Sequence, residues 1–312
     1  MTEQDCLKRM LAPGDKRPCP GYGNGVIQIW VTRNCDKSCF HCTQGANFSG
    51  APTAMTAEQF ERACATLSDY FGVVGMFGGN PAMHPQFRLL CEIMADYIPF
   101  SRRGIWCNNP LGKAATMRTV FNPAVSNLNV HLDAKAYGEF HRDWPESRPF
   151  GLHEDSRHPP VYVALRDVVP DSGERWQLIS ECDINHRWSA MVGVFRGQLR
   201  AWFCEVAGAQ SMLHQADPGY PDTGIEVKPG WWSRPIADFT EQIRKHCHDC
   251  GVPLKGRGLL AQATEGGEQV SQTHFFVCNP KMPGRGIELV EKIEQLGTGK
   301  VKLVTDYLGN AR

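Results

Sequence analysis

The first half of the 312-residue chain alternates short apolar segments with amphipathic helical patterns. Helices are predicted over residues 56–70, which open with the capping sequence TAEQ, and over residues 86–97. Strands that alternate with helices form βαβ units and a parallel sheet, whose active site lies at the carboxyl ends of the strands. The predicted strands are residues 26–32, 73–77, 104–107, 128–132 and 161–168.

The second half has a different pattern. Residues 191–204 form two apolar runs around Arg196-Gly197, which predicts a β-hairpin. Residues 236–247 have the pattern of an amphipathic helix that runs into Cys247-His248-Asp249-Cys250. We therefore predict a domain boundary near residue 175. The predicted divisions are an N-terminal extension (1–25), a core (26–175), a second domain (176–280) and a C-terminal extension (281–312).

The chain contains 13 cysteines, and its first 15 residues lack the apolar segment of a signal peptide. We expect a cytoplasmic protein, in which disulfides are disfavoured, so the cysteines indicate metal or redox chemistry. Cys64 and Cys91 fall within helical patterns and are expected to be small buried hydrophobes. Two groups are spaced like ligands, Cys35-x3-Cys39-x2-Cys42 and Cys247-x2-Cys250.

Composition narrows the class of partner. The 33 basic residues balance 33 acidic residues, and this charge balance disfavours nucleic acid as a partner. The sequence has no run of about 18 apolar residues, so no membrane partner is expected. A small-molecule substrate, neutral or modestly charged, or a peptide fits this composition better.

The first cysteine group directly follows the first predicted strand. Three thiolates on a short loop can hold three irons of a [4Fe-4S] cluster and leave the fourth iron open to another molecule. The alternative is a structural zinc ion with His41 as its fourth ligand, since thiolate and imidazole also suit zinc. The spacing alone leaves both possibilities open.

The sequence from Cys35 to Cys42, followed by Gly78-Gly79-Asn80-Pro81 after the next strand, resembles the radical S-adenosylmethionine (radical SAM) superfamily. The resemblance covers roughly residues 25–170 and implies a partial (β/α)6 barrel of α/β class. It further implies that a [4Fe-4S] cluster binds S-adenosylmethionine and cleaves it to a 5'-deoxyadenosyl radical, which removes a hydrogen from the substrate.

The same resemblance implies roles for residues near the strand ends. Asn80 stands where the family usually has Glu, and it can still accept a hydrogen bond from the methionine amino group, without charge. Gly78 and Gly79 directly precede Asn80 after the second predicted strand. In the family, such a glycine pair lies where the methionine amino group of the cofactor binds. The implied cofactor-binding residues are His41, Gly78, Gly79, Asn80, Asn108, Asn109, His131, Asp133 and Arg166.

Strand alternation predicts that His131 and Asp133 lie on one face of the fourth strand. The family more often has Ser-x-Asp there, so His131 is a candidate for proton handling, and His131 and Asp133 are the candidate catalytic residues. The alternative is that His131 is a polar residue with no chemical role. Arg166 is expected either to anchor the cofactor carboxylate or to form an ordinary ion pair.

The later cysteines are similar to the twitch domain, the short form of the SPASM auxiliary-cluster domain. Cys182, Cys204, Cys247 and Cys250 would then hold a second, fully ligated [4Fe-4S] cluster in a small C-terminal α+β domain. Cys247 to Cys250 taken alone also fits a zinc knuckle. Cys278 is a buried thiol or a substitute ligand for Cys182.

Among radical SAM enzymes with a twitch domain, the chain is similar to the aminocyclitol (2-deoxy-scyllo-inosamine) dehydrogenase type. This resemblance implies an oxidoreductase acting on a carbohydrate-like metabolite, with a flavodoxin- or ferredoxin-like electron donor. Three alternatives remain open: a ribosomal-peptide maturase, a redox-neutral isomerase or epimerase acting on a metabolite or nucleotide, and a zinc-stapled binding module presenting Trp231 and Trp232.

Overall fold

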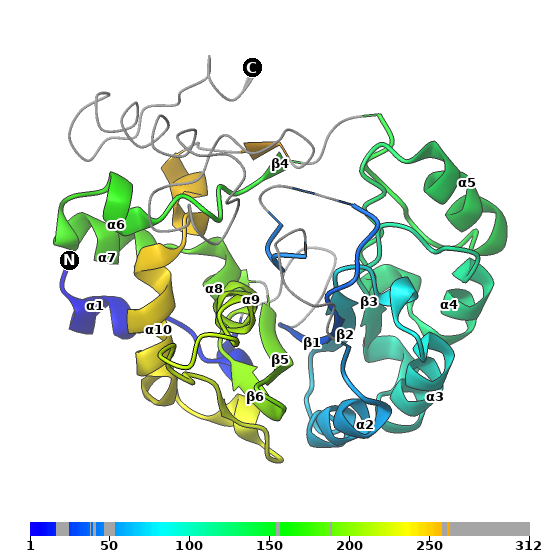
Figure 1. Cartoon of the computed structure of the whole chain (residues 1–312), viewed down its shortest axis with the longest axis horizontal. Helices are drawn as coiled ribbons and strands as arrows, with labels where there is room; N and C mark the ends of the chain where they lie inside the picture. Colours follow the sequence, from blue (N-terminus) through cyan, green and yellow to red (C-terminus); the bar gives the residue numbers. More distant parts are fainter. Residues whose placement is uncertain are drawn as a thin grey trace.

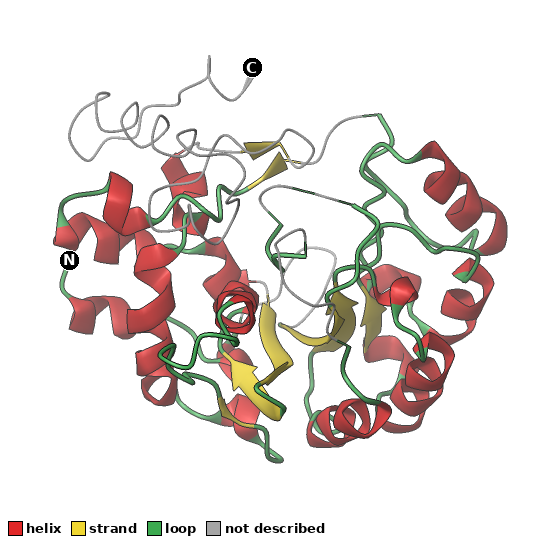
Figure 2. Ribbon diagram, viewed as in Figure 1, coloured by secondary structure: helices red, strands yellow, loops and turns green. Residues whose placement is uncertain are grey.

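A six-stranded mixed sheet lies at the centre of the computed structural model (Figures 1 and 2). The structure describes residues 1–16, 25–37, 39, 42–46, 54–153, 157–187, 189–257 and 261–262. The strand order is β3-β2-β1-β5-β6-β7, in which the first four strands pair in parallel, and β6 pairs antiparallel with both β5 and β7. The strands are β1 (Val26–Thr32), β2 (Val73–Gly78), β3 (Arg103–Ile105), β4 (Arg157–His158), β5 (Ser189–Phe195), β6 (Gln198–Trp202), β7 (Ile225–Glu226) and β8 (Ala261–Gln262), with β4 and β8 forming a separate antiparallel pair.

The helices form two groups on either side of the central strands. In Figure 1, α2 to α5 lie on the side of β2 and β3, and α1 and α6 to α10 lie on the side of β5 and β6. The α-helices are α1 (Glu3–Leu7), α2 (Ala57–Thr66), α3 (Phe87–Tyr97), α4 (Ala114–Val120), α5 (Ala134–Asp143), α6 (Leu165–Val168), α7 (Ser172–Ser180), α8 (Asp183–Arg187), α9 (Glu205–Leu213) and α10 (Thr240–His246). The 3-10 helices are η1 (Pro13–Asp15), η2 (Pro81–Met83), η3 (Phe100–Arg102), η4 (Pro123–Val125), η5 (Trp231–Ser233), η6 (Ile236–Phe239), η7 (Cys247–Asp249) and η8 (Val252–Arg257).

Several sequence predictions are confirmed. The first three predicted strands are β1, β2 and β3, and the predicted hairpin is β5 and β6 with a turn at Arg196-Gly197. The TAEQ sequence caps α2 as expected, because the Thr56 hydroxyl accepts from the Gln59 N–H and the Gln59 side chain accepts from the Thr56 N–H. Cys64 and Cys91 are buried on α2 and α3.

Two of the predicted strands differ. Residues 128–132 form no continuous strand, although the parallel bridges Trp106–Asn127 and Asn129–Phe150 extend the sheet-like arrangement beyond β3. Residues 161–168 form turns that end in α6. These turns begin where the N–H groups of Val161 and Val163 donate to the carbonyls of the preceding two prolines. The prediction was wrong because a short apolar run has the same pattern in a buried strand and in a buried helical segment.

The central sheet contains strands from both sides of the domain boundary predicted near residue 175. Residue 175 lies inside α7, and β5 pairs directly with β1. The predicted α/β class is confirmed, because the central sheet contains four parallel strands and is flanked by helices. Within the described ranges the sheet is open, so barrel closure stays a prediction. The predicted C-terminal extension and Cys278 lie outside the described residues.

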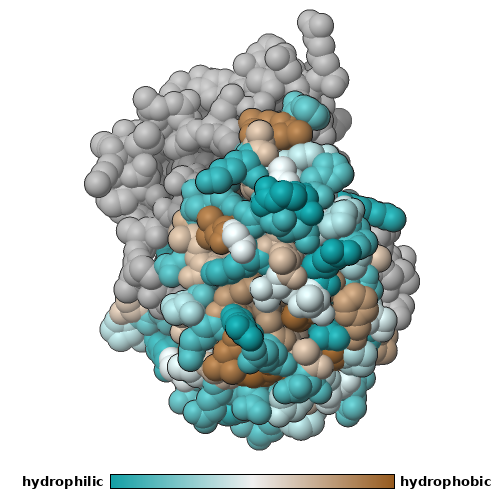
Figure 3. All heavy atoms as spheres, turned by 90° about the vertical axis from the view of Figure 1, so that its right-hand side faces the viewer, coloured by the Kyte–Doolittle hydropathy of each residue, from teal (hydrophilic) through white to brown (hydrophobic). Residues whose placement is uncertain are grey.

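The surface shown in Figure 3 is mostly hydrophilic, with apolar side chains in small groups between polar ones. No helix in the described part of the chain is long and apolar enough to cross a membrane.

Gly75 on β2 lies under the ring of Trp106. A Cβ atom at residue 75 would lie 2.0 Å from Cζ3 of Trp106, so Gly75→Ala must displace a large rigid ring. We expect this substitution to lower the free energy of unfolding by about 1–3 kcal/mol. Gly138→Ala is the control, because a Cβ at this position of α5 meets no atom within 4 Å. It is expected to stabilise the protein by roughly 0.5–1 kcal/mol. Urea denaturation of both variants tests the pair, and equal effects would contradict this account.

His84 connects the segment before α2 to the start of α3. Its Nε2 lies 2.9 Å from the Met55 carbonyl, while its Nδ1 accepts from the Gln86 N–H at 3.1 Å. These partners require the neutral Nε2–H tautomer. Burial is the main cause of a lowered pKa for His84.

Acid should therefore destabilise the protein through His84. Below a pH of about 6.5 the unfolded chain binds a proton that folded His84 does not, so stability falls by up to about 1.4 kcal/mol per pH unit. We expect the loss of stability between pH 7.5 and pH 5.5 to be smaller in His84→Gln than in the unmodified protein. Denaturation curves at both pH values measure this difference, and identical pH dependence would exclude the contribution of His84.

Candidate active site and cysteine clusters

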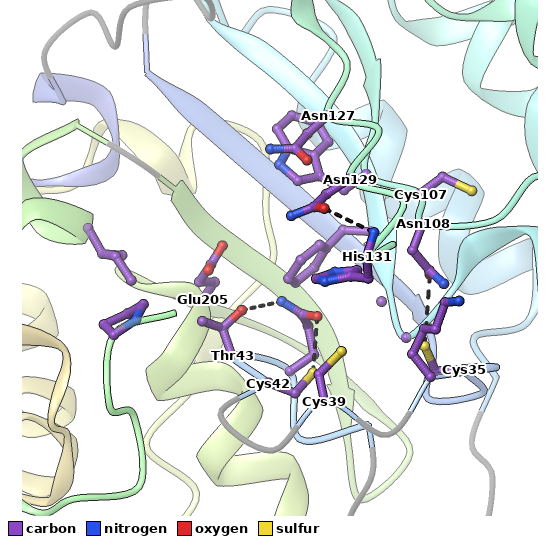
Figure 4. Close-up of a pocket in the computed structure, with 18 of the residues that line it drawn as sticks. Cys35, Cys39, Cys42, Thr43, Cys107, Asn108, Asn127, Asn129, His131 and Glu205 are labelled. Atoms are coloured by element: carbon purple, nitrogen blue, oxygen red, sulfur yellow. Dashed lines mark hydrogen bonds between the residues drawn. The ribbon is translucent and has the colours of Figure 1, made fainter. Parts of the chain in front are cut away.

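A cavity of about 340 Å³ opens at the carboxyl ends of β1 and β2 (Figure 4). The predicted trio Cys35, Cys39 and Cys42 lines it, and so do Gly78 and Gly79. In Figure 4, Cys39 and Cys42 lie next to each other, and Cys35 lies apart from them below Asn108. The parallel sheet therefore brings the cysteine loop and the glycine pair to one cavity, as the sequence predicts.

The cysteine loop is held by a carboxylate. Asp36 accepts hydrogen bonds from the side-chain amides of Asn80, Asn108 and Asn109, each at 2.9 Å. Burial raises the pKa of Asp36, but these amide bonds outweigh burial, so that its pKa is lowered overall. The loop between Cys35 and Cys39 is thus fixed to the ends of β2 and β3 by an ionised side chain.

The glycine pair is required by backbone packing. A Cβ at Gly78, which has φ +154°, would lie 2.4 Å from the Thr32 carbonyl oxygen, and a Cβ at Gly79 would lie 2.3 Å from the Asn34 carbonyl oxygen. Any side chain at these positions would push the two loops apart. The backbone of the pair therefore forms part of the cavity wall.

Asn80 lies behind that wall. It is fully buried, its Oδ1 accepts from the Ala82 N–H at the start of η2, and its amide donates to Asp36 and to the Asn109 carbonyl. Neither Asn80 nor Asn109 is among the described residues that line the cavity, whereas Asn108 is. The structure thus gives Asn80 a place in the Asp36 network, and its contact with a cofactor stays a prediction.

The two candidate catalytic residues lie in different environments. His131 lines the cavity, but Asp133 caps α5 by accepting from the Ala136 N–H and forms a 2.9 Å ion pair with Lys37. The predicted alternation was wrong, because His131 (φ 47°) and Leu132 (φ 64°) adopt left-handed backbone conformations that end the extended segment. Lys37 lines the same cavity as His131, and its ion pair holds Asp133 beside that cavity wall.

Arg166 is separate from the cavity wall. It lies on α6 and forms an ion pair with Asp249, which corresponds to the ordinary ion pair offered as the alternative. His41 lies outside the described residues, so its predicted cofactor contact stays a prediction.

The four later cysteines line one second, smaller cavity although they come from distant parts of the chain. Cys182 precedes α8, Cys204 is the N-cap of α9, Cys247 is the first residue of η7 and Cys250 is the C-cap of η7. Cys6, which the sequence analysis did not select, also interacts electrostatically with Cys182 and Cys247. The predicted set is therefore brought together by the fold.

The surroundings of the sulfur atoms fit thiolate ligands. The Cys42 sulfur accepts backbone N–H bonds from Gln44, Gly45 and Ala46, and the Cys182 sulfur accepts them from Ile184 and Asn185. Such N–H groups stabilise a thiolate and tune the potential of a cluster bound to it. A metal cluster at these positions would find its sulfur ligands already surrounded by suitable donors.

Burial of the thiols acts in the opposite direction. It raises the pKa of Cys35 and of Cys204 to about 12, and it also raises the pKa values of Cys247 and Cys250. These thiols therefore carry protons that metal binding must release. In the described part of the chain, no three His, Cys, Asp or Glu side chains converge as ligands of one metal ion. Each thiolate of an iron–sulfur cluster bonds a different iron, so its ligands need not converge on one point.

A buried carboxylate connects the two cysteine sites. Glu205 follows Cys204 directly, is 4% exposed and lines the first cavity. It accepts hydrogen bonds from Thr43, which follows Cys42, and from Gln28 on β1 and Ser189 on β5. The sequence analysis missed Glu205, because only the fold places the residue after Cys204 beside the residue after Cys42.

Comparisons with known proteins give a similarity at the level of structure. No model of a known protein family and no curated protein matches the chain. Among solved structures, the chain is similar to the crystal structure of BtrN in complex with AdoMet and 2-DOIA, with 15% sequence identity and a TM-score of 0.41. The match covers 75% of this chain and 88% of the BtrN chain.

Proposed function

We propose that this protein is a radical SAM oxidoreductase with an auxiliary iron–sulfur cluster. The observation that carries the proposal is the division of the seven predicted ligand cysteines between two cavities. The trio Cys35, Cys39 and Cys42 lines a cavity with room for a further molecule, whereas Cys182, Cys204, Cys247 and Cys250 line a smaller cavity. The first cavity is also lined by Cys107, but its thiol donates to the Asn80 side chain and the Asn109 carbonyl. Three thiolates leave one iron of a [4Fe-4S] cluster open, and four leave none.

The chain's own residues would hold the reactants in the first cavity. The bonds from three asparagines to Asp36 fix the loop that carries Cys35 and Cys39, and the backbone at Gly78 and Gly79 supplies a close wall without side chains. When bound there, the cluster supplies the electron that cleaves S-adenosylmethionine to the 5'-deoxyadenosyl radical. Fixed walls keep such a radical near the hydrogen it is to remove.

The substrate we propose is small, polar and carbohydrate-like. The first cavity is lined by the neutral amides of Asn127, Asn129 and Gln44, with His131 near them. Two lysines and two acidic residues also line it: Lys37, Lys255, Asp183 and Glu205. Amides both donate and accept, which suits a molecule with several hydroxyl groups. His131 would move a proton to or from a substrate hydroxyl, and a flavodoxin- or ferredoxin-like protein would supply electrons.

Replacing Cys35, Cys39 and Cys42 together by Ala should reduce formation of 5'-deoxyadenosine at least 100-fold, because these residues would hold the cluster that reacts with S-adenosylmethionine. The anaerobically purified variant should keep about half of the iron, since the other four cysteines are intact. Iron analysis and product chromatography measure both. Replacing the buried Cys64 and Cys91 by Ala is the matched control and should change neither quantity. Undiminished 5'-deoxyadenosine formation would refute the proposal.

Replacing Cys247 and Cys250 by Ala separates oxidation from isomerisation. Cleavage of S-adenosylmethionine depends on the first site and should continue, whereas oxidised product should fall at least tenfold relative to 5'-deoxyadenosine, because the second site would take up the substrate electron. Both products are quantified in the same anaerobic assay with candidate polyols. An unchanged ratio would favour a redox-neutral isomerase, and a wild-type protein that contains zinc without sulfide would favour a binding module.

A further inference from the structure

Lys16 is a buried cation beside the four-cysteine cavity. It follows η1, its side chain is 4% exposed, and its Nζ donates to the Phe203 carbonyl at 2.5 Å. Phe203 directly precedes Cys204, so the ammonium group lies next to the backbone that carries one of the four thiols. Gly25 makes room for the lysine stem, because a Cβ there would lie 2.9 Å from the Lys16 Cβ.

The charge of Lys16 has no ordinary partner. None of the ion pairs among the described residues includes Lys16. The groups that favour its charge are, in decreasing order, Cys204, Cys182 and Glu205. Burial lowers the pKa of Lys16 to about 8, which leaves it mostly protonated at pH 7. A buried cation without an ion pair is costly, and two of its three interacting groups are the thiols of the second site.

We propose that Lys16 is the counter-charge of the four-cysteine site and raises the reduction potential of the cluster bound there. The inference rests on the proposed function, because it requires a [4Fe-4S] cluster at Cys182, Cys204, Cys247 and Cys250. An oxidised core of charge +2 with four thiolates carries a net charge of −2, and taking up one electron makes it −3. A fixed positive charge stabilises the −3 state more than the −2 state, so it favours reduction.

This arrangement suits a dehydrogenase. After loss of a hydrogen atom, a hydroxyl-bearing carbon radical must lose one more electron, and its hydroxyl must lose a proton, before a carbonyl forms. The electron would pass to the auxiliary cluster, and the proton to solvent or a base in the first cavity. Lys16 does not line the first cavity, so it would act on this step through its charge at the second site, without touching the substrate, and is therefore a positioning residue.

The test measures the potential of the second cluster alone. In the Cys35→Ala, Cys39→Ala and Cys42→Ala background, the remaining cluster is titrated with reductant under anaerobic conditions and its reduced form is followed by electron paramagnetic resonance. Adding Lys16→Met should make one-electron reduction at least tenfold less favourable, a shift of about 59 mV toward negative potential. Adding Lys228→Met, which removes an ammonium that is 68% exposed, should leave the potential unchanged. Equal potentials for Lys16→Met and the background would overturn the inference.

A second pair of variants separates charge from hydrogen bonding. Lys16→Gln keeps a donor for the Phe203 carbonyl without the charge and should shift the potential as Lys16→Met does, whereas Lys16→Arg should restore it. A normal potential in Lys16→Gln would assign the effect to the hydrogen bond and refute the role of charge. If circular dichroism shows folded Met and Gln variants that lose the cluster while the Arg variant keeps it, the charge is required to hold the anionic cluster, which supports the inference. A background protein without any cluster would instead refute the second site of the proposed function.

Discussion

The hydrogen bonding of β1 on both of its edges determines how the rest of the molecule is arranged. β1 pairs in parallel with β2 on one side and with β5 on the other, and all of its residues are buried. The loop after β1 carries the first cysteine group, the end of β2 carries Gly78 and Gly79, and β5 leads through β6 to Cys204. One strand thus brings together the cavity wall, the first three thiols and one thiol of the second cavity.

Polar groups buried beside this strand refine that arrangement. Gln28 is the one polar side chain in the middle of β1, and it donates to Ser189 and Glu205. Asp36 holds three asparagines in a similar way at the strand ends. Buried polar groups of this kind are stable only when their partners are in place, so they specify one register of the strands and loops.

The sequence was sufficient to predict what depends on local pattern. Three of the five predicted strands and the capping box lie within short segments and appear in the structure, and the closely spaced trio Cys35, Cys39 and Cys42 lines one cavity. It was insufficient where the outcome depends on distant partners. The orientation of Asn80 follows from Asp36, and the backbone at His131 departs from strand geometry in a way that alternation cannot reveal. Single buried ionisable residues such as Lys16 and Glu205 produce no periodic pattern in the sequence.

The two cysteine groups differ in how much chain they enclose. The first lies between residues 35 and 42, so a cluster there closes only a short loop. The second joins segments between residues 182 and 250, which are far apart in an unfolded chain. A cross-link over a longer loop removes more conformational entropy from the unfolded chain. The second cluster would therefore cross-link the folded chain as well as carry electrons. It can assemble only after the β5–β6 hairpin, α9 and α10 have reached their folded positions.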